Sequence, residues 1–199
     1  MFITIEGIDG TGKSSLAKAL AERLGQSRVL LTREPTDASP WGRRLREAAT
    51  QGRLSHEEEI DHFHRDRLHH LESVIKPALA AGKIVISDRY VDSTLAYQAA
   101  SPQDADRLYA QMTGDLLEPD IVLILECPVR LALKRIGKGR SAHSRFELEE
   151  TLNRAAQIYK SRPGARYHHI DASRPFRDVL AAALAAIESH ATPRGPKDG

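Results

Sequence analysis

The sequence predicts an α/β fold, a five-stranded parallel sheet with helices on both of its faces. Two patterns lead to this prediction. Short runs rich in Ile, Val and Leu continue without the polar alternation that is typical of a sheet with one face in water. Longer segments of mixed polarity separate these runs, as helices do in the connections between parallel strands. The 199 residues suit one such domain and are too few for a second catalytic domain.

The expected elements alternate along the chain. Strands are predicted from the apolar runs at 2–5, 29–31, 84–87 and 121–125, and a fifth from a weaker run at 167–170. Helices are predicted in the remaining long segments, at 13–25, 41–51, 56–81, 103–116, 128–136, 145–161 and 175–190. Gly82 is expected to end the long third helix, because glycine readily takes the left-handed conformation that follows a helix.

Composition narrows the class of protein. The formal net charge of +2 does not indicate a nucleic-acid partner, and no apolar run reaches the roughly 20 residues of a membrane helix. A single cysteine, Cys127, excludes an internal disulfide framework and is typical of a reducing compartment. The chain starts with a strand rather than a secretion signal, so we expect a cytoplasmic protein. Residues 1–191 are expected to form one domain, and 192–199 a disordered tail.

A glycine-rich loop joins the first strand to the first helix. It reads Gly-Ile-Asp-Gly-Thr-Gly-Lys-Ser and matches the phosphate-loop pattern GxxxxGK[ST] in full. In such a loop, backbone N–H groups and a helix N-terminus surround phosphate oxygens. We expect Lys13 to contact the β and γ phosphates of ATP and the Ser14 hydroxyl to coordinate Mg²⁺. The predicted phosphate-binding residues are Gly7, Ile8, Asp9, Gly10, Thr11, Gly12, Lys13, Ser14 and Ser15.

The loop alone does not identify the group that accepts the phosphate. The only asparagine, Asn153, is followed by Arg154, so the base-reading Asn-Lys-x-Asp motif of switch GTPases is absent. Three further motifs lie at strand ends or on neighbouring helices, where open α/β sheets bind ligands. They are Arg33-Glu34-Pro35, Phe63-x-x-Asp66-Arg67, and Asp88-Arg89-Tyr90-x-x-Ser93-Thr94-x-Ala96-Tyr97-Gln98.

Together with the phosphate loop, these motifs resemble the thymidylate kinase family of P-loop nucleoside monophosphate kinases. The resemblance runs from Phe2 to about Ile170. It implies a P-loop kinase architecture with a mobile lid, and ATP-dependent phosphorylation of dTMP to dTDP with Mg²⁺ as cofactor. It also implies a homodimer. One departure is the segment 36–38, Thr-Asp-Ala here, where many members of the family have Gly-Gly-Thr.

The resemblance implies roles around the acceptor phosphate. Arg89 would grip the phosphate of dTMP, since a guanidinium can bind two phosphate oxygens at once. Asp9 would meet the acceptor sugar and its phosphate, and Arg33 would add to the phosphate contacts. Asp88 would help to organise Mg²⁺ through water. The alternatives from the residues alone are an ion pair between Asp88 and Arg89, and a turn-favouring role for Asp9.

The family resemblance also implies a base and sugar site. Phe63 would stack on thymine, and Arg67, one helical turn later, would bond a base carbonyl. Thr94 and Gln98 would address the base edge, and Tyr97 would crowd the ribose 2′ position to favour deoxyribose. Taken in isolation, Phe63 is better explained as an ordinary core residue, and it is the adjacent Asp66-Arg67 pair with the downstream motif that favours the base site.

A basic segment from Lys134 to Arg145 holds no acidic residue and contains two glycines. The family resemblance implies that this segment contains the lid, at about 137–145. The phosphate loop has Gly10 at a position where some members of the family have an arginine. Arg140 and Arg145 are therefore the candidates for neutralising charge on the migrating phosphoryl group. The alternative is a solvated basic face. For the whole chain, the rivals are a kinase for another pyrimidine monophosphate, a deoxynucleoside kinase with Glu34 as base, and a P-loop ATPase.

Overall fold

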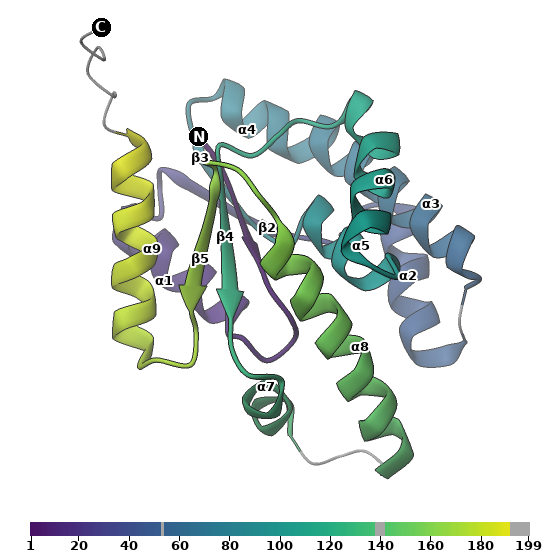
Figure 1. Cartoon of the computed structure of the whole chain (residues 1–199). Helices are drawn as coiled ribbons and strands as arrows, with labels where there is room; N and C mark the ends of the chain where they lie inside the picture. The colour runs from purple at the N-terminus through teal and green to yellow at the C-terminus, as the bar shows by residue number, and fades with distance from the viewer. Residues whose placement is uncertain (53, 138–141, 192–199) are drawn as a thin grey trace, which may run out of the picture.

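The structure, a computed structural model, describes residues 1–52, 54–137 and 142–191 (Figure 1). Its centre is a parallel sheet in the order β2-β3-β1-β4-β5. The strands are β1 (Phe2–Glu6), β2 (Val29–Arg33), β3 (Ile84–Asp88), β4 (Ile121–Glu126) and β5 (Tyr167–Asp171). Each extends one or two residues beyond its predicted C-terminal end. The prediction of a five-stranded parallel sheet is therefore confirmed.

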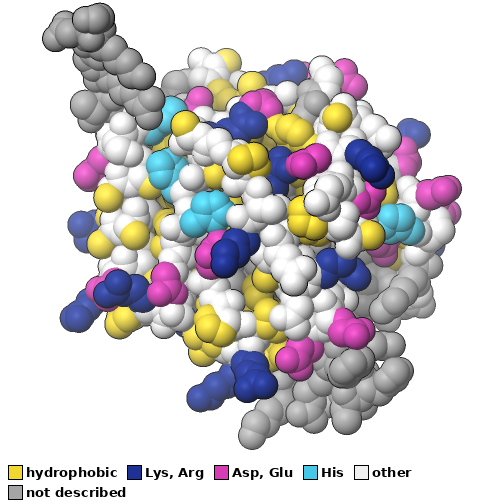
Figure 2. Space-filling view, in the orientation of Figure 1, with side chains coloured by type: hydrophobic (Ala, Val, Ile, Leu, Met, Phe, Trp, Pro, Cys, Tyr) yellow, Lys and Arg dark blue, Asp and Glu magenta, His cyan; other side chains and the backbone are white. Residues whose placement is uncertain are grey.

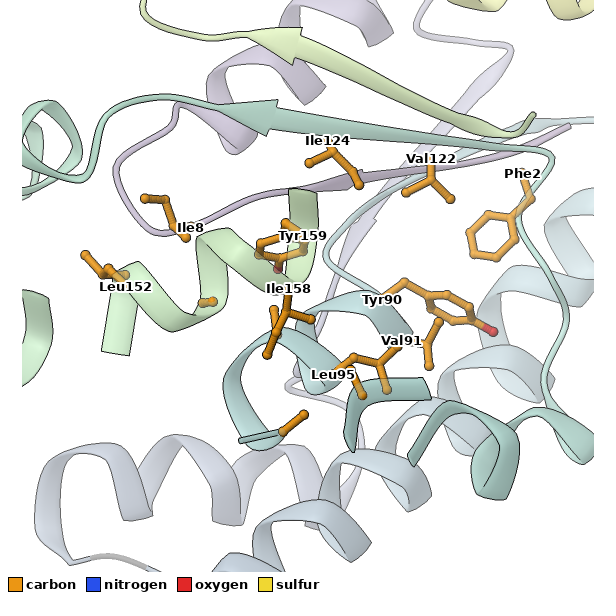
Figure 3. Close-up of a cluster of buried hydrophobic side chains, with 14 of the residues drawn as sticks. Phe2, Ile8, Tyr90, Val91, Leu95, Val122, Ile124, Leu152, Ile158 and Tyr159 are labelled. Carbon is orange, nitrogen blue, oxygen red and sulfur yellow. The ribbon is translucent and has the colours of Figure 1, made fainter. Parts of the chain in front are cut away.

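Helices cover both faces of the sheet, as Figure 1 shows. Helices α1 (Lys13–Leu24) and α9 (Phe176–Ala191) lie together on one face. On the other face α5 (Val91–Gln98) and α8 (Ala142–Ser161) pack against each other and the sheet. Residues of β4 alternate between the two cores, because successive side chains of a strand point to opposite faces. Figure 3 shows the α8-side core, which includes Val122 and Ile124.

A long helical stretch begins with α3 (His56–His70). Ser55 and Glu58 cap its start reciprocally, side chain to backbone in both directions. One π-helical turn, η1 (Leu71–Ile75), then leads into α4 (Lys76–Ala80). Gly82 follows with a φ of 74° and donates its N–H to the Leu79 carbonyl, as expected of a glycine that ends a helix. The predicted helix at 56–81 is confirmed, with an unpredicted π turn within it.

The remaining helices are α2 (Pro40–Gln51), α6 (Pro102–Met112) and α7 (Val129–Ile136). The helix predicted at 103–116 ends at Met112 and is followed by a 3-10 turn, η2 (Thr113–Asp115). Helix α5 was not predicted. In the described parts of the chain, no helix is long and apolar enough to cross a membrane. Figure 2 shows basic and acidic side chains interspersed on the visible face.

The strand register brings functional segments together at one edge of the sheet. Arg33 and Ile5 both pair with Asp88, so the C-terminal ends of the three strands β2, β3 and β1 lie side by side. The glycine-rich loop follows β1 and opens α1, and α5 begins three residues after Asp88. This edge is where parallel α/β sheets bind ligands.

Candidate functional site

The phosphate loop has the backbone shape that its glycines allow. Gly10 and Gly12 have φ angles of 85° and 95°, in the region that other residues rarely adopt. A Cβ atom on Gly10 would lie 2.5 Å from the Ala132 carbonyl oxygen of α7. The loop therefore passes too close to α7 for any side chain at this position. It leads into the first turn of α1, and the N-terminus of a helix favours a phosphate group.

Lys13 lies at the centre of this loop. Its Nζ donates to the carbonyl oxygens of Gly7 and Ile8, at 2.9 and 3.0 Å, and lies 3.8 Å from Asp9 Oδ1. Burial, together with the nearby charge of Arg89, lowers the pKa of the Lys13 ammonium to about 8. At neutral pH Lys13 thus remains mostly protonated, as a group that binds phosphate must be.

Ser14 and Asp88 form the arrangement that would hold a divalent cation. The Ser14 hydroxyl donates to Asp88 Oδ2 at 2.5 Å. The second carboxylate oxygen, Oδ1, is buried and has no hydrogen-bond partner among the described residues. Mg²⁺ prefers oxygen ligands of this kind and commonly binds one or two carboxylates. The pair also lines a pocket with the phosphate loop, so the residues present fit the metal.

Arg89 connects the loop with the start of α5. Its φ of 77° makes it the only non-glycine residue with a positive φ in the described chain. Its Nη2 donates to Asp9 Oδ1, and its Nη1 donates to the Ser93 hydroxyl at 3.0 Å. The guanidinium also lies 5.2 Å above the centre of the Tyr97 ring. An arginine whose backbone is strained and whose side chain is held by several contacts at a pocket is typical of a functional site.

A pocket of about 360 Å³ opens beside Arg89. Its lining joins α2, α3 and α5 to the phosphate loop, and consists of Asp9, Pro35, Leu45, Ala49, Glu59, Phe63, Arg89, Ser93, Tyr97 and Gln98. Four residues predicted to bind the acceptor, from segments far apart in sequence, thus lie around one space, together with Asp9. Phe63 is half-buried in this wall and belongs to neither of the described hydrophobic cores, which argues against the core interpretation.

Two polar contacts fix the end of the pocket that α5 forms. The Tyr97 hydroxyl accepts the backbone N–H of Asp9 at 3.0 Å, and the Gln98 amide donates to Glu59 at 3.0 Å. Burial raises the pKa of Tyr97 to about 12, so the phenol stays neutral. The phosphate loop and α5 are therefore joined at the point where the pocket meets the loop.

Comparison with known proteins agrees with this geometry. A model of the thymidylate kinase family matches residues 5–183. The chain belongs to the thymidylate kinase family. A thymidylate kinase of Xanthomonas campestris pv. campestris (strain B100) is 43% identical over 190 residues, which cover 94% of this chain and 82% of the relative. One of Xanthomonas oryzae pv. oryzae (strain PXO99A) is 40% identical over 201 residues, covering 100% and 88%. The predicted family is confirmed.

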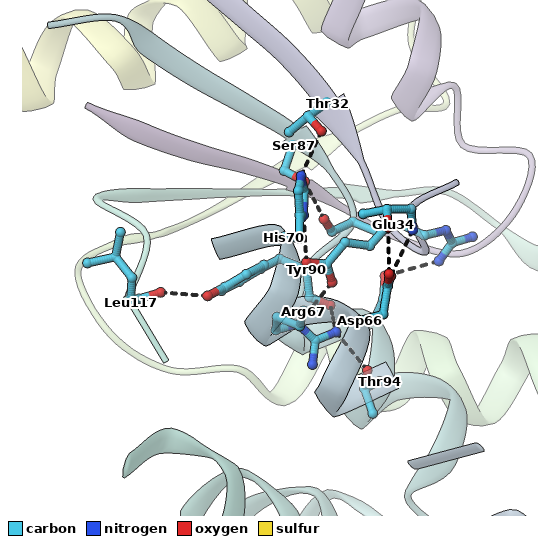
Figure 4. Close-up of polar contacts among 12 residues, drawn as sticks. Thr32, Glu34, Asp66, Arg67, His70, Ser87, Tyr90, Thr94 and Leu117 are labelled. Carbon is cyan, nitrogen blue, oxygen red and sulfur yellow. Dashed lines mark hydrogen bonds and ion pairs between the residues drawn. The ribbon is translucent and has the colours of Figure 1, made fainter. Parts of the chain in front are cut away.

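Two of the residues assigned through the thymidylate kinase family, Arg67 and Thr94, do not line the pocket. Arg67 is 1% exposed, and its Nε pairs with Glu34 at 2.9 Å (Figure 4). Its Nη2 donates to the Tyr90 carbonyl and to the Thr94 hydroxyl, at 3.1 and 2.9 Å. The remaining nitrogen, Nη1, is buried and has no partner among the described residues. Arg67 and Thr94 therefore contact each other, and Arg67 keeps one donor unused.

Arg33 lies apart from the other acceptor residues. It does not line the pocket beside Arg89, but a separate one of about 540 Å³ between α1, η1 and the end of β2. Its guanidinium pairs with Asp37 at 3.1 Å, and Arg46 pairs with the same carboxylate at 2.7 Å. Asp37 belongs to the segment that departs from the family pattern. The departure thus provides Arg33 with a partner outside the acceptor pocket.

The predicted lid falls partly outside the described residues. Arg140 is among those not described, and Arg145 lies in the first turn of α8, where only the backbone is described. Their roles stay predictions. Arg135, in the same basic segment, received no role from the sequence. Its guanidinium donates to the carbonyls of Ala172, at 3.0 Å, and Gly10, at 3.4 Å, and so joins the phosphate loop to the turn after β5. Only its place in the basic segment hinted at this.

Proposed function

We propose that the protein transfers the γ-phosphoryl group of ATP to the phosphate of dTMP, giving ADP and dTDP. The observation that supports this most directly is that two pockets meet. The phosphate-loop pocket contains Lys13, Ser14 and Asp88, and the acceptor pocket contains Phe63. Asp9 and Arg89 line both. A donor phosphate and an acceptor phosphate would therefore meet at these two residues. Membership of the thymidylate kinase family supports this reaction.

The chemistry needs little more than positioning and charge neutralisation. The second pKa of a phosphate monoester lies near ~6, so the attacking oxygen of dTMP is ionised at neutral pH and needs no base. This oxygen forms the new bond to the γ phosphorus, while the bond to the β–γ bridging oxygen breaks and ADP leaves. Lys13 would hold the donor phosphates and Arg89 the acceptor phosphate. Mg²⁺ bound at Ser14 and Asp88 would offset charge on the donor phosphates.

The side chains of the acceptor pocket suit a deoxynucleotide with a flat base. Phe63 offers an aromatic face for stacking thymine. Arg67, on the same helix as Phe63, has a buried Nη1 with no partner among the described residues, and this donor would suit a base carbonyl. Tyr97 is held by its hydrogen bond to Asp9, and its ring would crowd a 2′-hydroxyl. Gln98 and Thr94 would approach the base edge. The lid arginines, Arg140 and Arg145, would meet the migrating group.

The surroundings of Glu34 argue against the rival assignment as a deoxynucleoside kinase, because they do not suit a general base. Such an enzyme must remove a proton from a sugar hydroxyl, and Glu34 was the candidate. The side chain of Glu34 is 3% exposed and accepts hydrogen bonds from Arg67, at 2.9 Å, and His70, at 3.0 Å. It lines neither of the two pockets that meet at Arg89. An acceptor that is already ionised is therefore the better fit.

One assay separates the remaining assignments. ADP release is measured with saturating ATP and Mg²⁺ in the presence of dTMP, dUMP, UMP or thymidine, and with no acceptor. We expect the highest kcat/KM for dTMP, a lower one for dUMP, which lacks only a methyl group, and lower still for UMP. Thymidine should give no turnover above background. ADP release at the same rate with and without any monophosphate would identify an ATPase instead. The homodimer is a separate proposal, tested by light scattering.

A further inference from the structure

Glu6, the last residue of β1, is fully buried beside the proposed site and has no role so far. Its carboxylate accepts three hydrogen bonds, all from neutral groups. The Tyr90 N–H donates to Oε1 at 2.7 Å, and the hydroxyls of Ser93 and Tyr159 donate to Oε2 at 2.6 and 3.1 Å. Within the described residues no Lys or Arg pairs with it directly. Burying a carboxylate without such a partner costs free energy, so an isolated core role is a poor explanation.

The contacts of Glu6 converge on Arg89 by two routes. The first is the backbone. Arg89 holds its left-handed conformation because its N–H donates to the Ile5 carbonyl, its own carbonyl accepts from Ser87, and the next N–H is held by Glu6. Strained φ values persist only when surrounding contacts fix them in this way. Glu6 thus fixes the peptide group that follows Arg89 and stabilises the turn from which the arginine side chain extends.

The second route is the Ser93 hydroxyl. A hydroxyl has one proton to give and lone pairs to accept. A carboxylate can only accept, so Ser93 donates its one proton to Glu6, at 2.6 Å. Its lone pairs remain for Arg89 Nη1, at 3.0 Å, and face the Tyr159 hydroxyl, also at 3.0 Å. Glu6 therefore sets the direction of this hydrogen bond and makes Ser93 an acceptor for the guanidinium. A glutamine amide could instead donate to Ser93 and free the hydroxyl proton to point at Arg89.

We propose that Glu6 is a positioning residue, which holds the Arg89 backbone and, through Ser93, directs the guanidinium at the acceptor phosphate. The inference rests on the proposed function, in which Arg89 binds that phosphate. Four other charged or titratable groups face Glu6: Asp92 from α5, Arg89 from the turn before it, Lys13 from α1 and Tyr159 from α8. Figure 3 shows Tyr159 in the same core as Tyr90.

The test compares a ligand with a phosphate and one without. Dissociation constants for dTMP and thymidine are measured by calorimetry at pH 8. Burial and the charge of Asp92 raise the pKa of Glu6 to about 7, so at pH 8 it is mostly ionised, as is the dTMP phosphate. The variants are Arg89→Ala, Glu6→Gln and the double variant. We expect Glu6→Gln to weaken dTMP binding about tenfold, the effect of one charge-assisted hydrogen bond. Thymidine binding should stay within threefold, and the double variant should match Arg89→Ala.

The outcomes separate this inference from the proposed function. If Arg89→Ala leaves the dTMP-to-thymidine affinity ratio unchanged, the assignment of Arg89 itself fails. If Arg89→Ala lowers the ratio and Glu6→Gln does not, the positioning role of Glu6 is overturned. Equal loss of both ligands in a folded Glu6→Gln protein would also overturn it, since that is the result of a purely structural role.

Two more variants serve as a control and as a replacement in this test. Tyr90→Phe is the matched control, because it removes a hydroxyl that donates to the Leu117 carbonyl in the same core and keeps the backbone N–H that donates to Glu6. The ratio should stay within twofold, and a tenfold fall would contradict the proposed route. If Glu6→Gln does not fold, Ser93→Ala takes its place, because it removes the link between the two side chains and leaves Glu6 bound to Tyr90. Ser93→Ala should lower the ratio in the same direction, and no change would overturn the side-chain route.

Discussion

The phosphate loop and the acceptor pocket share Asp9 and Arg89 but are built differently. The loop is one continuous segment, and its shape comes from backbone angles at glycines and from contacts of Lys13 with carbonyls five and six residues away. The acceptor pocket gathers side chains from α2, α3, α5 and the loop itself. A site made mainly of backbone is encoded locally, whereas one made of side chains depends on how distant elements pack.

This difference has a functional counterpart. Any nucleoside triphosphate presents the same phosphates, so a backbone cradle with one lysine can serve it. Selecting one acceptor among similar monophosphates requires shape and placed polar groups, which the ring of Phe63, the ring of Tyr97 and the amide of Gln98 can supply. Substitutions in the two regions should therefore have different kinetic consequences.

The largest effect is expected in the phosphate loop. Lys13→Ala removes the buried cation that would contact the donor phosphates, and kcat should fall by about 10³ or more, the range for charged contacts to a transferring phosphoryl group. Circular dichroism and melting should stay close to wild type. Arg23→Ala, which removes an exposed cation in the last turn of the same helix, is the control and should keep full activity. Activity of Lys13→Ala within tenfold of wild type would be incompatible with the loop mechanism.

The next effect concerns the predicted lid. If Arg140 and Arg145 meet charge that develops during transfer, replacing either with alanine should lower kcat by about 10²–10³ with little change in the KM for dTMP. Arg130→Ala, an exposed arginine on α7, is the control. Steady-state kinetics in which each substrate is varied while the other is saturating decide the question. A fall of less than threefold in both variants favours the solvated basic face, and a raised KM for ATP at constant kcat indicates ground-state nucleotide binding.

A smaller, selective effect is expected in the acceptor pocket. Phe63→Ala should weaken dTMP binding by about 1–3 kcal/mol, the range for base–aromatic stacking. ATP affinity should not change, because Phe63 lines only the acceptor side. Phe176→Ala, which removes a ring that is 49% exposed on α9, should affect neither ligand. Global unfolding of the Phe63→Ala protein in a melting experiment would instead support the core interpretation.

The smallest effect concerns sugar choice. Tyr97→Ala should narrow the preference for dTMP over its ribose counterpart by about 1 kcal/mol, the low end of what pocket shape contributes to discrimination. Tyr97→Phe keeps the ring and should keep the preference, although the Asp9 N–H loses its acceptor. The ratio of kcat/KM values for the two nucleotides measures this. An unchanged ratio in the alanine variant would remove Tyr97 from the sugar site.

The same contrast explains what the sequence could predict of the fold. The central strands β1, β3 and β4 are mainly apolar runs in the covered part of the sheet, so local sequence is sufficient to identify them. The edge strand β5 contains two histidines and is partly exposed, so its signal was weaker. Helix α5 was missed because its buried positions include Asp92 and Thr94 as well as Val91 and Leu95, which removes the apolar periodicity. These polar residues are tolerated because distant partners, Arg162 and Arg67, satisfy them.

The site was predictable to the extent that a motif fixes its own geometry. Helical spacing placed Arg67 one turn from Phe63, but it could not show that Glu34, Tyr90 and Thr94 would enclose the guanidinium (Figure 4). Likewise, the sequence could not place Arg33, whose position depends on Asp37. Glu6 carried one unused signal, a charged side chain at the end of a fully buried strand whose other residues are uncharged.

The claim that the two regions act separately is tested most directly by a crossed binding measurement. ATP and dTMP are each titrated calorimetrically into Lys13→Ala and Phe63→Ala, with Mg²⁺ present. We predict that Lys13→Ala loses ATP affinity and keeps dTMP affinity within threefold, while Phe63→Ala does the reverse. Loss of both ligands in either folded variant would contradict the account, because the two pockets would then not be independent binding regions that meet at Asp9 and Arg89.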